Sequence, residues 1–205
     1  MDAGRDAMRP RRGQRPSPRP PWALVLVAAG IAVLVGASLW SALRPREAPA
    51  VAPSGVVGTR PGDTAPEFRL VDIEGRVVTR TGLLSGGKPG LLFFTTTWCL
   101  PCIEGLRQLQ RFQQELGAPE PFRVLIVFVD PREGEADVRR YRDRYGFPRS
   151  WFYAPDTDRM VWKYGVRYLD TKFVLDPQAV IRWTDVYPAG YDTWGRALAT
   201  VGVGR

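Results

Sequence analysis

Two cysteines, the only ones in this chain of 205 residues, lie between a segment typical of a buried strand and a segment typical of a helix. The apolar run 90–94 leads towards Cys99 and Cys102. After them, apolar residues recur every three or four positions over 103–116, and Gly117 ends the pattern. The sequence therefore predicts a strand–turn–helix unit with Cys99 in the first turn of the helix.

The predicted position of Cys99 has a chemical consequence. The first N–H groups of a helix have no partner within it, and the helix dipole is positive at this end. A thiolate is stabilised there, so its pKa falls below the free value of ~8.5. Pro101 lacks an N–H, but an N–H in the first turn would have no helical partner anyway. We expect Cys99 to be the nucleophile and Cys102, one turn further on, to be the resolving thiol.

Two other interpretations of the cysteine pair are a stabilising disulfide and part of a metal site. The entropic stabilisation from a disulfide grows with the length of the loop it closes, and this loop is very short. A structural zinc site takes four Cys or His ligands, whereas the chain has no histidine and no third cysteine. The pattern favours redox chemistry with no metal, and with no cofactor beyond the redox-active Cys99–Cys102 disulfide.

The net charge of +8 does not indicate a nucleic-acid partner. Residues 1–46 hold eight Arg and two Asp, which gives +6. The remaining residues hold 21 Lys and Arg against 19 Asp and Glu, which gives +2. The positive charge therefore belongs to the N-terminal segment rather than to a face of a folded domain.

The N-terminal segment is predicted to anchor the chain in a membrane. Residues 1–21 are rich in Arg and Pro and should form a disordered, basic, cytoplasmic tail. The uncharged segment 22–43 would extend roughly 33 Å as a helix, enough to cross a hydrocarbon core of ~30 Å. Six Arg precede this transmembrane helix and two follow it, so the N-terminus should stay in the cytoplasm.

These features predict a single-pass protein of the cell membrane with its folded domain, residues 62–205, on the extracytoplasmic (periplasmic) side. A linker rich in Pro, Ala and Gly would connect the two over 44–61. The alternative is a cleaved signal sequence. The cleavage candidate, residues 48–50, is weak because it lies well past the apolar run.

Periodicity and turn residues predict the elements of the domain. Apolar runs at 91–96 and 122–129 are typical of strands buried on both faces. Strand–helix units followed by a hairpin and a helix indicate an α/β domain with a central mixed β-sheet flanked by helices. The other expected elements are a hairpin over 68–79 with a turn at Glu74-Gly75, helices over 136–145 and 156–164 with Asp156 as N-cap, strands at 172–175 and 179–184, and a final helix over 191–201.

Three separated segments carry a family resemblance. They are Ala-Pro-Glu-Phe at 65–68, the W-C-x-P-C motif at the end of 93–102, and Tyr-Gly-Val at 164–166 with Thr-Lys-Phe-Val-Leu-Asp-Pro at 171–177. On these segments the chain resembles the thioredoxin superfamily and, within it, the TlpA/ResA-like membrane-anchored thiol–disulfide oxidoreductases with a redoxin (AhpC/TSA-like) domain.

The resemblance implies a thioredoxin-like fold with an N-terminal β-hairpin extension. It also implies exchange of disulfides with client proteins outside the cytoplasm. Some members of the family serve cytochrome c maturation or oxidase assembly. A membrane or extracytoplasmic electron donor would then restore the dithiol.

The chain departs from the family pattern at three positions. Asp170 stands where the family has a cis-proline, so the peptide bond before Asp170 is predicted to be trans. Gly105 stands where many relatives have a glutamate, and Glu104 is one position away. Phe93 stands where thioredoxins carry a buried acid. The usual proton partner of the cysteines is therefore missing from both expected places.

Several residues near the motif are candidates for supporting roles. Asp170 is a candidate acid/base group for the thiols, and the alternative is a solvated loop carboxylate. Trp98 is expected to pack beside the pair and shield it, and the alternative is core packing. The family resemblance adds three more candidates for supporting roles, Pro101, Thr171 and Glu104.

Two other functions use related features. Thr96 stands three residues before Cys99, as in peroxiredoxin-like thiol peroxidases. Copper-delivery proteins of the Sco type share the fold and the anchor but use C-x-x-x-C and a histidine. Here Cu(I) would have only Cys99 and Cys102, with Asp170 or Met160 as further ligands.

Overall fold

The computed structural model describes residues 51–117 and 120–204. The predicted cytoplasmic tail, the predicted transmembrane helix over 22–43 and the first part of the linker lie outside these residues. Within 51–117 and 120–204, the structure has no helix that is both long enough and apolar enough to cross a membrane.

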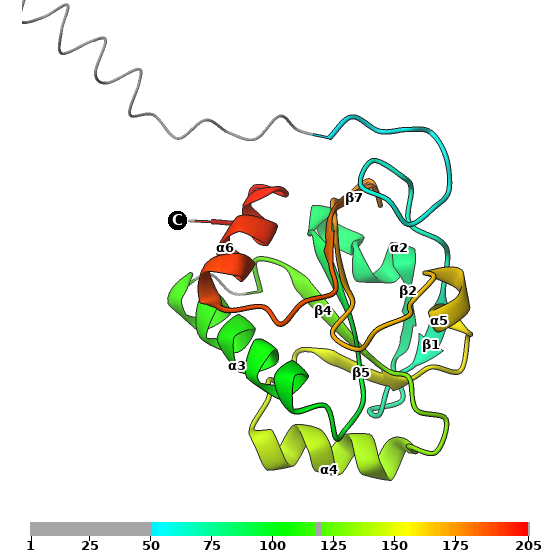
Figure 1. Cartoon of the computed structure of the whole chain (residues 1–205), viewed down its shortest axis with the longest axis vertical. Coiled ribbons are helices and arrows are strands. Elements are labelled where there is room, and N and C mark those ends of the chain that lie inside the picture. Colours follow the sequence, from blue (N-terminus) through cyan, green and yellow to red (C-terminus); the bar gives the residue numbers. More distant parts are fainter. Residues whose placement is uncertain (1–50, 118–119, 205) are drawn as a thin grey trace, which may run out of the picture. The chain divides into compact units, whose positions relative to one another are not determined.

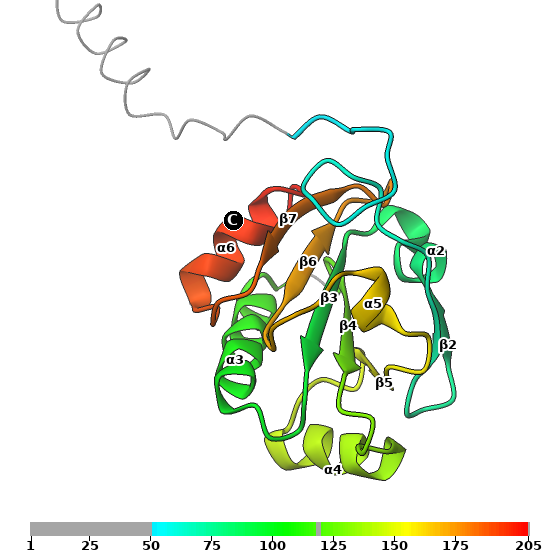
Figure 2. The same cartoon turned by 45° about the vertical axis from the view of Figure 1, so that its right-hand side comes forward.

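A five-stranded mixed sheet forms the centre of the domain, in the order β5-β4-β3-β6-β7. The parallel part consists of β3 (Gly90–Thr95), β4 (Arg123–Phe128) and β5 (Phe152–Pro155). Strand β6 (Lys172–Leu175) pairs antiparallel with β3, and β7 (Ile181–Asp185) pairs antiparallel with β6. Figure 2 shows β3 near the middle of the sheet. The predicted mixed sheet is therefore confirmed, and the cysteines follow its central strand.

Alternate residues of β3 face two separate hydrophobic cores. Leu91 and Phe93 belong to a core that contains both cysteines, and Leu92 and Phe94 belong to the other. The first core is closed by α3 (Leu100–Glu115), α4 (Glu135–Tyr145) and α6 (Tyr191–Ala199), as Figure 1 shows. The second core is closed by the hairpin of β1 (Arg69–Val71) and β2 (Val77–Thr79) with α2 (Arg80–Leu83) and α5 (Met160–Lys163).

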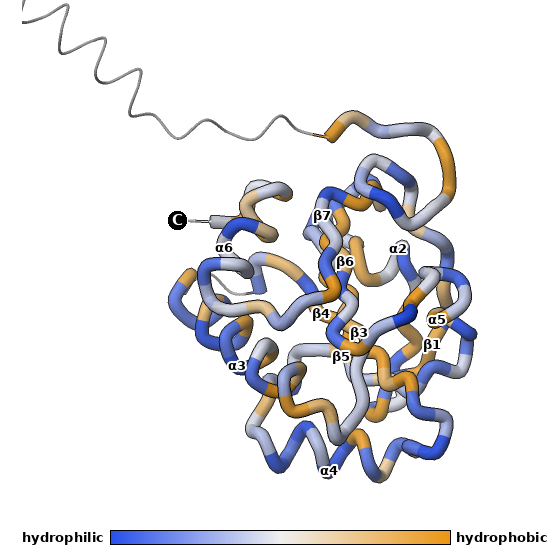
Figure 3. The backbone as a smooth tube through the Cα atoms, viewed as in Figure 1, coloured by the Kyte–Doolittle hydropathy of each residue, from blue (hydrophilic) through white to orange (hydrophobic). Residues whose placement is uncertain are grey.

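The distribution of apolar residues explains why the strands lie inside the domain and the helices cover them. Figure 3 shows apolar residues concentrated on the central strands, whereas α4 is largely hydrophilic. Helix α4 still contributes the buried residues Val138 and Tyr141, so only one stripe of an otherwise charged helix contacts the core.

Several predicted elements have different bounds in the structure. The hairpin is confirmed with strands of three residues each, and Gly75 at its turn has φ +77°. The helix predicted over 156–164 is only the short α5, although Asp156 accepts hydrogen bonds from its first N–H groups, those of Met160 and Val161. Helix α2 and a 3₁₀ turn η1 (Ser85–Gly87), which were not predicted, lie between β2 and β3.

Strand β5 was not predicted. Its four residues, Phe152–Pro155, are too few to show a period. Part of the predicted linker also contacts the domain, since Ser54 N–H donates to the carbonyl of Gly62 and Val57 bridges to Thr64.

Candidate active site

The two cysteines form a disulfide at the junction of β3 and α3. Cys99 is the N-cap of α3, and its Cα lies 5.3 Å from that of Cys102 in the first turn. Cys99 keeps 7% of its surface exposed, whereas Cys102 is fully buried. This asymmetry suits a nucleophile that meets an external disulfide and a resolving thiol that does not.

Cys99 opens onto a cavity of about 430 Å³, which we call the disulfide groove. One side, the cysteine wall, is the segment 98–101. The other side, the loop wall, consists of Leu169, Asp170, Val186 and Pro188, from the segments that precede β6 and follow β7. The groove is mostly apolar apart from Asp170, and its volume lies within the range of ordinary ligand sites.

Trp98 and Leu100 project from the cysteine wall into solvent. They are 60% and 73% exposed, and the Trp98 Nε1–H donates to Asp130 Oδ2 at 3.3 Å. Hydrogen bonds from Arg132 hold the pKa of Asp130 below its usual range, so this acceptor is ionised. Trp98 therefore lines the groove beside Cys99, and the alternative of core packing is wrong. Large exposed apolar side chains at a groove are typical of a contact surface.

The backbone of β3 holds Asp170 beside the strand that leads to the cysteines. Asp170 N–H donates to the carbonyl of Phe94 at 3.0 Å, and Phe94 N–H donates to the carbonyl of Thr171 at 2.8 Å. The described residues contain no cis peptide bond, so the trans prediction is confirmed, and Asp170 instead adopts φ +67°. A left-handed conformation is uncommon for a residue other than glycine and favours Asn or Asp among the rest.

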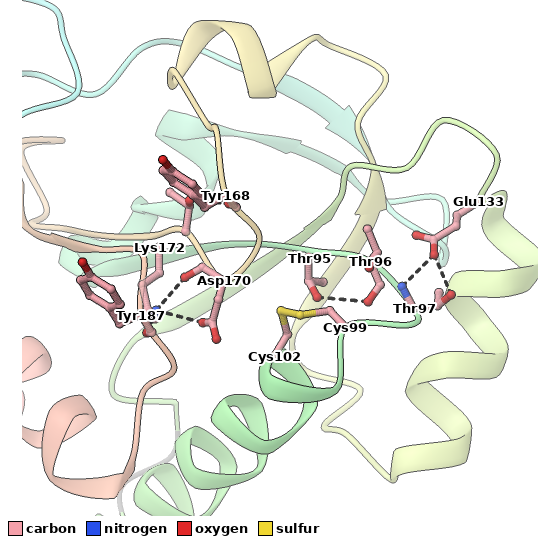
Figure 4. Close-up of a disulfide and its surroundings, with 11 residues drawn as sticks. Thr95, Thr96, Thr97, Cys99, Cys102, Glu133, Tyr168, Asp170, Lys172 and Tyr187 are labelled. Carbon is pink, nitrogen blue, oxygen red and sulfur yellow. Dashed lines mark hydrogen bonds and ion pairs between the residues drawn. A yellow bond between two sulfur atoms is a disulfide. The ribbon is translucent and has the colours of Figure 1, made fainter.

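The interpretation of Asp170 as a solvated loop residue is wrong. Asp170 is only 3% exposed, and Thr171 beside it is also buried, with its Oγ1–H donating to the carbonyl of Tyr168 at 2.6 Å. Apart from an ion pair with Lys172, neither carboxylate oxygen of Asp170 accepts a hydrogen bond from the described residues. The structure thus places a buried carboxylate, short of partners, in the groove that Cys99 lines (Figure 4).

Lys172 was not among the sequence candidates, yet it is the charged partner of Asp170. Its Nζ lies 2.9 Å from Asp170 Oδ1 and donates to the carbonyls of Asp170 and Tyr187, at 2.6 Å each. Lys172 is fully buried, with Nζ 5.7 Å from the ring centre of Phe93 and 5.9 Å from that of Trp194. The available signal was a lysine at the start of an otherwise apolar strand, a position where a charge requires a partner.

Burial dominates the electrostatics of this ion pair. It raises the pKa of Asp170 and lowers the pKa of Lys172, and in both cases the partner's charge only partly opposes the shift. Each charge is therefore retained largely because the other is present.

Glu133 is a second residue that sequence reasoning missed. It lies in the loop between β4 and α4, where its Oε1 accepts hydrogen bonds from the N–H and Oγ1–H of Thr97 at 2.8 and 2.6 Å. Its other carboxylate oxygen is buried without a hydrogen bond from the described residues, as is the Oγ1 of Thr96. Glu133 thus fixes the segment immediately before Cys99, and a single glutamate in a charged loop gave no sign of this role.

The structure does not bring Glu104 to the disulfide groove. Its carboxylate is exposed, accepts a hydrogen bond from Gln108 at 2.7 Å and lies 3.8 Å from Arg107. Pro101, in contrast, lines the groove at the start of α3. The role proposed for Glu104 beside the thiols has no geometric support.

Met160, one of the ligands considered for copper, is not brought to the cysteines. Met160 is buried in the hydrophobic core on the face of the sheet that does not hold the cysteines. Among residues 51–117 and 120–204, no three Cys, His, Asp or Glu side chains are grouped closely enough to hold a metal ion.

A strand–disulfide–helix junction at the centre of this sheet is typical of thioredoxin-like thiol–disulfide oxidoreductases, and comparison with known proteins confirms that class. Residues 61–184 match the model of the AhpC/TSA family, and the chain belongs to this family.

The chain is 30% identical to the thioredoxin-like protein YneN of Bacillus subtilis, over 62% of its own length and 71% of that protein. It is 32% identical to the thiol-disulfide oxidoreductase ResA of Geobacillus thermodenitrificans, over 59% and 66%. A solved thiol:disulfide interchange protein of Chlorobium tepidum superposes with a TM-score of 0.58 at 20% identity, over 71% of this chain and 99% of that one. This last likeness supports the fold.

Proposed function

We propose that this chain exchanges disulfides with client proteins outside the cytoplasm, through Cys99 and Cys102. The observation that carries the proposal is the disulfide at the N-terminus of α3, with Cys99 at the groove and Cys102 beneath it. The AhpC/TSA family and the names of the relatives support the same chemistry.

The reaction begins from the dithiol. Unpaired N–H groups and the dipole of α3 stabilise the Cys99 thiolate, which attacks a client disulfide. A mixed disulfide forms and the first client sulfur leaves as a thiolate. Cys102 then loses its proton and attacks Cys99 Sγ, which releases the second client thiolate and leaves the Cys99–Cys102 disulfide. Two electrons have passed to the client, and no bound cofactor is needed.

Asp170 is the group that we assign to the proton of Cys102. Its buried carboxylate lies in the disulfide groove, where the ion pair with Lys172 is its polar contact among the described residues. Burial raises its pKa, and a carboxylate with a raised pKa is a better proton acceptor for a thiol. The protonated Asp170 then returns the proton to the departing client thiolate, so protons balance over the cycle.

Exposed apolar side chains provide the contact for the client. Trp98 and Leu100 stand at the cysteine wall, and Val186 at the loop wall is 36% exposed. A client segment with an apolar residue next to its cysteine would fill this groove while Cys99 attacks. Cytochromes c or oxidase subunits awaiting maturation are the clients that the family resemblance suggests.

The proposed location rests on the sequence. The apolar segment 22–43 and the excess of Arg before it favour an N-terminal anchor with the domain on the far side of the cell membrane. A membrane or extracytoplasmic electron donor would then reduce the disulfide after each cycle.

Two measurements test the proposal on the full chain. The reduction potential of the Cys99/Cys102 couple should be strongly reducing if the chain is a reductase, and a high potential would assign it to an oxidase or isomerase. In intact cells, a membrane-impermeant thiol reagent should label Cys99 after mild reduction. Labelling that appears only after cell lysis would refute the extracytoplasmic location without affecting the exchange chemistry.

A further inference from the structure

Lys172 is a fully buried cation that the exchange reaction, as described, does not use. A lysine side chain is almost never fully buried unless it is paired. The Lys172 ammonium group contacts two carbonyl oxygens and the Asp170 carboxylate, all within 2.9 Å. A side chain bound this completely has a fixed position, so its charge acts at one defined place.

That place is beside the disulfide groove. Lys172 opens strand β6 and is the register partner of Phe93 on β3, the strand that leads to Cys99. Its other carbonyl partner, Tyr187, stands between Val186 and Pro188 of the loop wall. One ammonium group therefore ties together the two segments that build the loop wall, as Figure 4 shows for Asp170, Lys172 and Tyr187.

The positive charge on Lys172 also offsets an electrostatic effect of Asp170 on the Cys99 thiol. A carboxylate close to a thiolate repels it and raises the pKa of the thiol, against the effect of the helix N-terminus. An uncompensated Asp170 would therefore make Cys99 less reactive at neutral pH. We propose that Lys172 is a positioning residue of the exchange reaction: it neutralises Asp170 and holds the loop wall, so that the site keeps a carboxylate beside Cys99 without losing the thiolate.

Other charged groups near the pair do not take over this role. Asp185 of β7, the register partner of Lys172 on that side, adds negative charge. Tyr141 of α4 is buried and neutral, since burial raises its pKa, and Glu133 adds a further carboxylate near Tyr141. Lys172 is the cation paired with Asp170, whereas Arg107 acts on Tyr141, so removing Lys172 leaves the Asp170 carboxylate without its counter-charge.

The inference rests on Cys99 being the nucleophile of the proposed exchange, and it is tested on the full chain by thiol titration. The rate of Cys99 alkylation is followed against pH in the reduced protein, with modification at Cys99 identified by peptide mapping. Lys172→Gln removes the charge but keeps N–H donors, whereas Lys172→Met removes both. Asp170→Asn removes the opposing charge, and a double variant removes the pair. Lys88→Gln, a lysine at the far end of β3 that pairs with Glu120, is the control.

The expected changes have opposite signs. Lys172→Gln and Lys172→Met should raise the pKa of Cys99. When this pKa lies above neutral pH, each increase of one in its value lowers the thiolate fraction, and so the alkylation rate, about tenfold. Asp170→Asn should lower the pKa and speed alkylation, and the double variant should return close to the unsubstituted chain. Lys88→Gln should leave the curve unchanged. Lys172→Met should raise the Km of client exchange more than Lys172→Gln does, because only the Met variant loses the hydrogen bond to Tyr187.

Two results would overturn the inference. An unchanged alkylation curve in Lys172→Gln would show that its charge does not reach Cys99. Changes in the same direction for Lys172→Gln and Asp170→Asn would indicate general loosening of the wall. If Lys172→Met does not fold, Lys172→Gln and the double variant still decide the sign. A chain that alkylates as expected but exchanges with no client disulfide or dithiol refutes the proposed function and leaves only the effect of Lys172 on the Cys99 thiol standing.

Discussion

The two walls of the disulfide groove are built in different ways. The cysteine wall comes from one continuous segment, 98–101, whose shape follows from the end of β3 and the start of α3. The loop wall combines two segments from before β6 and after β7, joined by the buried Lys172. The first wall carries exposed apolar surface and the second carries buried charge. The comparison indicates that the nucleophile is positioned locally, whereas its electrostatic surroundings depend on long-range contacts.

The largest expected effect is on the cysteine wall itself. Cys99→Ser should reduce disulfide exchange by at least about a thousandfold, because serine is a poor nucleophile at neutral pH. Cys102→Ser should still attack but not resolve, so a stable mixed disulfide between Cys99 and the client should accumulate. Mass spectrometry after reaction with an oxidised client distinguishes the two. Equal trapping by both variants would contradict the assignment of roles.

The walls should differ sharply in stability. Lys172→Met leaves Asp170 buried without its cation, and breaking a buried ion pair in this way costs about 3–5 kcal/mol. The matched change on the cysteine wall, Leu100→Met, alters a side chain that is 73% exposed and should change the unfolding free energy by less than about 0.5 kcal/mol. Denaturant unfolding of the full chain in detergent measures both, and similar losses would show that the walls do not differ.

The pH dependence of stability should report the buried carboxylate. Asp170 has a raised pKa in the folded chain, so the folded state keeps its proton to higher pH than the unfolded state does. The contribution of Asp170 to the unfolding free energy should therefore fall as pH rises from the ordinary Asp pKa of 3.8 to the raised pKa, with a slope of up to about 1.4 kcal/mol per pH unit between the two values.

Asp170→Asn lacks this decline. Its stability relative to the unsubstituted chain should grow with pH over the same window and then level off. Unfolding curves between acid and neutral pH test this expectation. A constant difference between the two proteins would mean that Asp170 titrates normally.

A smaller effect is expected where a loop supports the cysteine wall. Glu133→Gln weakens the two charge-assisted hydrogen bonds to Thr97 and should destabilise the chain by about 1–2 kcal/mol. Glu104→Gln alters an exposed glutamate outside the disulfide groove and should change neither stability nor exchange rate measurably. An activity loss in Glu104→Gln that exceeds the loss in Glu133→Gln would reverse our ranking of the two carboxylates.

The smallest effect concerns client contact. Trp98→Ala removes an exposed side chain, so the fold should be little affected while the Km for client proteins rises several-fold. Steady-state exchange kinetics with a protein client measure this change. A small dithiol or disulfide substrate, which has too little surface to cover the Trp98 side chain, is the control, and an equal loss with that substrate would argue against a contact role.

The features that could be predicted from the sequence are those that depend on residues close together along the chain. The strand before Cys99, the helix after Cys102 and the turn at Gly75 each depend on neighbours within a few positions, and all three were predicted correctly. The trans peptide bond before Asp170 was also predictable, since a cis bond is costly without proline. Strand β5 was not predicted because its four residues are too few to show a period. They form a strand by pairing with β4.

The sequence by itself determined the strand–disulfide–helix unit, the mixed α/β sheet around it and the segregation of positive charge in the N-terminal segment, because periodicity, helix termini and composition act over short distances along the chain. Only the tertiary structure decided that Asp170 is buried, that Lys172 neutralises it and that Glu133 fixes Thr97. These facts depend on hydrogen bonds between β3 and β6 and on a loop from β4, which bring together residues far apart in the sequence and remove them from water. Burial, which no local pattern specifies, is what distinguishes these charged residues from ordinary surface charges.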